Sequence, residues 1–193
     1  MRYGGRLNRI EFTALIDQQA NRIRGSVTTL PLYGPAGWPG PCRLGAWGWE
    51  DDRLIHAGLH FEAADGPWVE VITTAGPPMP QLIDLRMAAA GERPGDRRAL
   101  ERALDAASSP AGERVTITVD GVPREFSRWP DEPLGEDRGR GWLAILDEVP
   151  GLLLRASGVD PHGLRLDRVQ DIEPHLTGTR AHLLAGYDAY GTG

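Results

Sequence analysis

The sequence predicts an α+β fold, in which an antiparallel sheet built from hairpins is combined with helices at the N-terminus, in the middle and at the C-terminus. Three observations support this prediction. Residues 8–24 repeat apolar side chains at helical spacing, residues 53–62 alternate apolar with polar side chains, and an Asp-Gly pair at 120–121 separates two β-prone runs. Because the strands are expected to pair as hairpins, a parallel nucleotide-binding sheet is disfavoured.

The N-terminal part is expected to hold one helix and a long connection. The helix over 8–24 begins with a capping box, since Glu11 follows Asn8 by three residues. Residues 26–32 are β-prone. Residues 31–48 are dense in proline and glycine, which is typical of an ordered loop between short elements.

The alternation over 53–62 predicts a strand with one buried face. A turn at 63–66 leads into a second β-rich run at 68–74, so the two runs predict a hairpin. Residues 76–80 contain three prolines and are expected to end this unit.

A helix is expected over 94–107, from the spacing of its leucines and alanines. The following hairpin turns at Asp120-Gly121, which pairs Val119 with Val122 and Val115 with Phe126. The remaining expected elements are a hairpin over 142–146 and 152–157, a short strand or helical turn over 164–169, and a final helix over 179–187.

The chain of 193 residues is long enough to bury a core without disulfides or metals. We expect a single domain over 1–193, and the arrangement is compatible with two subdomains at about 1–90 and 91–193. No internal sequence repeat supports such a division.

Composition excludes several classes of function. The net charge of −6 disfavours nucleic-acid binding and attachment to anionic lipid. The first residues show no apolar signal segment, and no window is apolar enough to span a membrane, so a cytoplasmic location is expected. A single cysteine excludes an internal disulfide and fits a reducing compartment. The basic residues are all arginine, which is typical of a GC-rich bacterial genome.

His56, His60 and Glu62 are expected on one face of the strand over 53–62, opposite its apolar face. Histidines beside a carboxylate can bind a metal or transfer protons. However, four residues of extended chain separate the imidazoles by roughly 13 Å, which is too far to share one ion. We expect this to be a solvated sheet face, and retain the three residues as candidates for catalysis.

Cys42 lies next to Arg43, whose guanidinium could lower the pKa of the thiol and favour the nucleophilic thiolate. Catalysis would also need a histidine base brought close by the fold. The sequence around Cys42 matches no nucleophile motif, so a small, partly buried side chain is the simpler interpretation.

The loop expected after residue 31 contains aromatic residues that could bind a ligand or partner, namely Tyr33, Trp38, Trp47 and Trp49. Its glycines superficially resemble a phosphate-binding loop. The prolines between them lack the N–H groups that bind phosphate, so that role is disfavoured.

The chain has no nucleotide, zinc-protease, hydrolase or kinase motif, and no cofactor or metal is expected. The favoured hypothesis is a non-catalytic protein that binds a protein partner or a small ligand through the aromatic loop. One alternative is an uncommon hydrolase or transferase that uses Cys42 or the His56, His60 and Glu62 face. Another is a structural subunit that forms a homodimer through an apolar edge strand.

Overall fold

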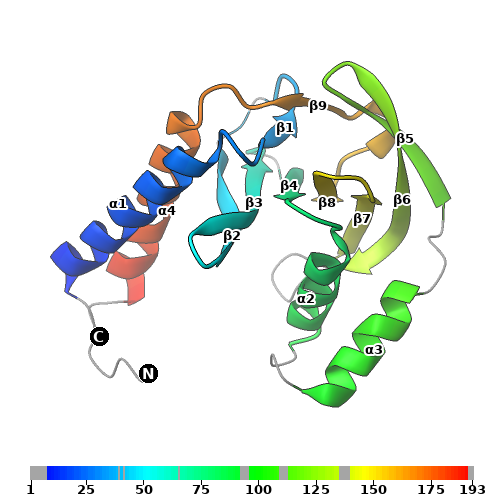
Figure 1. Cartoon of the computed structure of the whole chain (residues 1–193), viewed down its shortest axis with the longest axis horizontal. Coiled ribbons are helices and arrows are strands. Elements are labelled where there is room, and N and C mark those ends of the chain that lie inside the picture. The colour runs from blue at the N-terminus through cyan, green and yellow to red at the C-terminus, as the bar shows by residue number, and fades with distance from the viewer. Residues whose placement is uncertain are drawn as a thin grey trace.

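The computed structural model describes residues 8–38, 40, 42–64, 66–91, 96–108, 113–134 and 140–190. It confirms the mixed α+β fold. Over these residues the chain forms one curled, mostly antiparallel sheet of nine strands, together with four helices (Figure 1). The helices lie at the N-terminus, in the middle and at the C-terminus, as the sequence predicts. In the described part of the chain, no helix combines the length and apolar character needed to cross a membrane.

The strands are β1 (Tyr33–Pro35), β2 (Cys42–Glu50), β3 (Arg53–Glu62), β4 (Trp68–Thr74), β5 (Glu113–Val119), β6 (Val122–Pro133), β7 (Arg140–Leu146), β8 (Gly151–Ser157) and β9 (Arg165–Arg168). The helices are α1 (Arg9–Ser26), α2 (Met79–Ala89), α3 (Arg97–Ser108) and α4 (Glu173–Tyr190), with a 3₁₀ turn at Pro161–Gly163. The strand order is β1-β9-β5-β6-β7-β8-β4-β3-β2, in which β5 and β9 are parallel. Strand β4 from the first half of the chain pairs with β8 from the second half.

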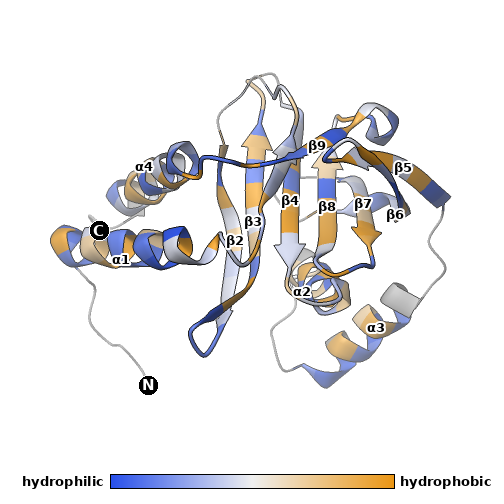
Figure 2. Cartoon of the chain, turned by 45° about the horizontal axis from the view of Figure 1, so that its top comes forward, coloured by the Kyte–Doolittle hydropathy of each residue, from blue (hydrophilic) through white to orange (hydrophobic). Residues whose placement is uncertain are grey.

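The core is divided between the two faces of the sheet. The sheet curls so that β1 contacts β3 and β4, and its inner face buries apolar side chains of β4 to β9. A second cluster continues on this face over β2 and β3, where α1 and α4 lie side by side (Figure 2). On the opposite face, Leu82 of α2 packs against Ile72 and Leu153. Helix α2 therefore covers one end of this outer face.

Several predicted elements agree with the structure. Helix α1 begins at the Asn8 and Glu11 capping box, and both reciprocal hydrogen bonds are present. Strands β3 and β4 form an antiparallel hairpin. The pairing of β5 with β6 is consistent with the predicted register, in which Val119 lies opposite Val122. Residues 165–168 form a strand, which settles the choice left open for 164–169.

Two predictions of local structure were wrong. Residues 26–32 form the end of α1 and turns, and the long connection over 31–48 contains β1 and most of β2. Two glycines of β2 leave room for side chains of neighbouring strands. A Cβ on Gly45 would meet the carboxylate of Glu70, and a Cβ on Gly48 would meet the ring of His56. The prolines at residues 76–80 follow the end of the hairpin at Thr74, as predicted, but they also begin α2, a helix that the sequence did not predict. Proline is compatible with the first helical turn.

Candidate functional site: a polar cavity on the outer face of the sheet

A row of ionisable side chains crosses four neighbouring strands on the outer face. Arg43 of β2 lies opposite His60 of β3, His60 lies opposite Glu70 of β4, and Glu70 lies opposite Arg155 of β8. Directly opposed residues in antiparallel strands have their side chains on the same face. The pairing of the strands therefore gathers four charged or titratable groups from distant parts of the sequence.

A second row lies alongside the first and completes the floor of a cavity. In this row Glu62 of β3 lies opposite Trp68 of β4, and Trp68 lies opposite Ser157 of β8. The cavity has a volume of about 520 Å³, and His182 of α4 lines it from the side of β2. Its volume is in the range typical of small-molecule sites. We call this space the polar cavity, and its lining residues are Arg43, His60, Glu62, Gly66, Trp68, Ser157 and His182.

The carboxylate of Glu62 lies between two cationic or potentially cationic groups. Its Oε2 is 3.6 Å from Nη1 of Arg43 and 3.5 Å from Nε2 of His60. Both distances exceed the usual length of a charge-assisted hydrogen bond, which is about 2.7–2.9 Å. The side chain of Glu62 is 52% exposed, whereas that of His60 is 3% exposed. A half-exposed carboxylate thus lies beside two largely buried nitrogen-bearing side chains without a short contact to either.

Beneath the cavity, Glu70 and Arg155 form a buried ion pair. Glu70 is fully buried, and its Oε2 accepts a hydrogen bond from Nε of Arg155. The guanidinium also lies over the ring of Trp68, 5.8 Å from its centroid. Within the described residues, Oε1 of Glu70 has no hydrogen-bond partner. Removing these charges from water is unfavourable, and their mutual attraction offsets that cost only while both are present.

The structure separates His56 from His60, as the extended spacing predicts. The ring of His56 packs against Gly48 at the other end of β3, and burial lowers its pKa, an effect that the carboxylate of Asp84 opposes. The expectation of a solvated face was wrong, because His60 is only 2% exposed and β4 is buried along its whole length. Of the three candidates on β3, His60 and Glu62 line the polar cavity and His56 does not.

Cys42 does have a histidine beside it. Its Sγ contacts Nδ1 of His175, which α4 brings from 133 residues away. The thiol is partly buried, as the simpler interpretation has it, and the alternative of a lowered thiol pKa does not hold. Burial raises the pKa of Cys42 to about 11 and lowers the pKa of His175. Thiol and imidazole are therefore both neutral at pH 7, and a protonated thiol is a poor nucleophile.

The four aromatic candidates do not form one exposed surface, because each is partly buried against the core. Tyr33 packs against the cluster inside the curled sheet, and Trp38 lies between this cluster and the one beneath α1 and α4. Trp47 and Trp49 both pack against that second cluster, and the guanidinium of Arg22 lies 4.1 Å from the ring centroid of Trp49.

Local sequence patterns do not reveal four residues at or beside this site, namely Arg43, Glu70, Arg155 and His182. The position of Glu70 could have been found from the predicted hairpin over 53–74. Continuing the pairing of its two strands away from the turn places this carboxylate opposite His60. Arg155 and His182 come from β8 and α4, whose positions beside β4 and β2 depend on long-range packing. Local spacing has no information about such contacts.

Among the described residues, no group of three or more histidine, cysteine or acidic side chains is arranged to hold a metal ion. Comparisons with protein-family models, with curated proteins and with solved structures find no match to this chain.

Proposed function

We propose that this protein binds a small anionic molecule, carrying a carboxylate or phosphate group, in the polar cavity. The proposal depends chiefly on one observation, the position of Glu62. Its half-exposed carboxylate occupies the space between Arg43 and His60 at distances of 3.5–3.6 Å. An incoming anion with better geometry would displace this side chain into solvent and take its place.

The surroundings favour an anion that is held by several groups. Arginine presents a planar set of N–H donors that suits carboxylate and phosphate. Arg43 is mostly buried, with 20% of its side chain exposed, so little rotational freedom would be lost on binding. His182 lines the same cavity from α4 and supplies a further imidazole.

Binding is favoured over covalent catalysis through Cys42. The thiol is neutral, it does not line the polar cavity, and its histidine neighbour is neutral as well. The buried pair of Glu70 and Arg155 instead supports a site whose charges are fixed before a ligand arrives.

The experiment is an NMR titration of the intact chain with inorganic phosphate, with succinate and with the neutral analogue succinamide. We expect saturable shifts for phosphate or succinate at the amides of β3 and β4 near His60, and no shifts for succinamide. The Arg43→Gln variant should weaken binding about tenfold or more, because it removes the cation from the site.

Arg165→Gln is the matched control, because Arg165 is an exposed arginine on β9 that does not line the cavity. This variant should bind the anion as the wild type does. The proposal is wrong if neither anion gives saturable shifts, if succinamide binds equally well, or if the two arginine variants lose affinity to the same extent.

A further inference from the structure

A second cavity, of about 200 Å³, lies where α1 and α4 meet β2. Its walls include Ile16 and Ala20 of α1, Leu44 and Trp47 of β2, and Leu183 of α4. The lining is almost entirely apolar and contains no charged side chain among the described residues. Leu15 also lines the space and is 43% exposed, so the cavity opens to solvent at this side chain.

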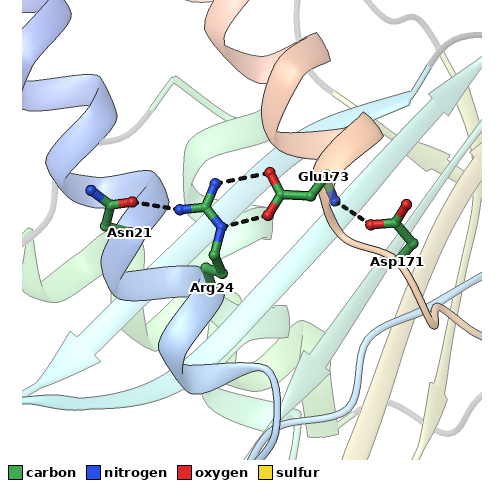
Figure 3. A network of polar contacts seen from close by, with 4 residues as sticks. All are labelled: Asn21, Arg24, Asp171 and Glu173. Atoms are coloured by element: carbon green, nitrogen blue, oxygen red, sulfur yellow. Dashed lines mark hydrogen bonds and ion pairs between the residues drawn. The ribbon is translucent and has the colours of Figure 1, made fainter.

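The two helices that form the walls are linked by side-chain contacts along their length. Three ion pairs join them, with Arg9 bound to Asp188, Asp17 to Arg180 and Arg24 to Glu173. Figure 3 shows the last of these, in which the guanidinium of Arg24 contacts both carboxylate oxygens of Glu173 and the side-chain oxygen of Asn21.

Helix α4 is also attached to the edge of the sheet. The backbone N–H of Leu44 donates a hydrogen bond to Oγ1 of Thr179 over 2.7 Å. At Gly178 the helix lies so close to β2 that a Cβ would clash with the carbonyl oxygen of Cys42. Helix α4 thus contacts β2 on one side and α1 on the other.

The polar groups on the lining restrict the chemistry of an occupant. The hydroxyl of Thr179 already donates to the carbonyl of His175 and accepts from Leu44. Among the described lining residues, Gln19 also has a polar side chain. A hydroxyl or charge placed among the apolar residues would lose its hydrogen bonds to water without replacement. An apolar cavity of about 150 Å³ in another protein is known to stay dry and to bind benzene.

We infer that this cavity is a binding site for a small hydrocarbon group, of the size of a single aromatic ring or a short alkyl chain. The volume and the apolar lining set the class of ligand. The inference is independent of anion binding in the polar cavity, because no described residue lines both cavities.

The test compares toluene with phenol, which has nearly the same shape but carries a hydroxyl. Methyl NMR spectra of the intact chain would be recorded during titration with each probe. We expect saturable shifts of the methyl groups of Leu44, Leu176 and Leu183 with toluene, and binding of phenol that is about tenfold weaker.

Ala20→Phe fills the cavity from α1 and should abolish the toluene shifts. Ala14→Phe adds the same ring at an exposed position of the same helix and should leave them unchanged. If Ala20→Phe fails to fold, Leu183→Trp fills the space from the opposite wall. The inference is overturned if toluene gives no saturable shifts, if phenol binds as tightly as toluene, or if the shifts persist in a folded, filled variant.

Discussion

The two cavities lie on either side of the same short segment, yet their chemistry is opposite. Arg43 and Leu44 are neighbours on β2; the first lines the polar cavity and the second lines the apolar one. Helix α4 repeats this division, since it contributes His182 to the polar cavity and Leu183 to the apolar one. Successive side chains point to opposite faces of a strand and in different directions around a helix. This is enough to separate two environments whose residues are neighbours in the sequence.

The cavities differ in how their walls are held in place. Next to the lining of the polar cavity lies a largely buried charge pair, Glu70 and Arg155, and each partner is tolerated only because the other is present. The walls of the apolar cavity are held by a hydrogen bond at the sheet edge and by ion pairs that are largely exposed. Single substitutions should therefore destabilise the protein most beneath the polar cavity.

The largest effect is expected for Arg155→Met. This change leaves the carboxylate of Glu70 buried without its cation, and should lower the free energy of unfolding by about 3–5 kcal/mol, measured by urea denaturation. The double variant with Glu70→Leu removes both charges and should regain most of the loss. A single variant that loses less than about 1 kcal/mol would show that this pair is not buried in solution.

A smaller effect is expected for Thr179→Val, at the attachment of α4 to β2. Valine has nearly the same shape but cannot accept the hydrogen bond from the buried N–H of Leu44, which should cost about 1–3 kcal/mol. The control is Thr13→Val. This change removes an exposed hydrogen bond from the Thr13 hydroxyl to the carbonyl of Arg9, and should have little effect on the free energy of unfolding measured by urea denaturation. Equal losses in the two variants would contradict the role given to Thr179.

The smallest effect on the free energy of unfolding is expected from a change of pH. Burial lowers the pKa of both His56 and His175 in the folded chain, so below about pH 6.5 the unfolded chain binds more protons than the folded one. The free energy of unfolding should be highest above that pH and should fall as the pH is lowered toward 5. His175→Gln should make the fall shallower, and an unchanged pH profile would contradict burial of this imidazole.

Much of the fold could be predicted from local patterns, and the exceptions have physical causes. The capping box at Asn8 and the alternation in β3 are local signals, and the structure contains both elements. Strand β2 has no such signal, because glycine weakens a strand pattern and its glycines are needed only where Glu70 and His56 occupy the space of a Cβ. Those contacts come from other strands and cannot be predicted from the segment itself.

The polar cavity was predictable only in part, for the same reason. The alternation placed His60 and Glu62 on one face, but whether that face is solvated depends on what packs over it. The prolines at residues 76–80 mark the end of the hairpin but give no signal for the helix that they begin, and this helix, α2, covers part of the face. Arg155 and His182 reach the cavity through tertiary packing alone.

The most direct test of anion binding is the affinity of the Glu62→Gln variant for inorganic phosphate, compared with that of the wild type in the same NMR titration. Glutamine keeps the size of the side chain but removes the charge that competes for Arg43 and His60. We expect the variant to bind phosphate several-fold more tightly than the wild type. Equal or weaker binding would contradict the claim that the carboxylate of Glu62 occupies the place of the ligand.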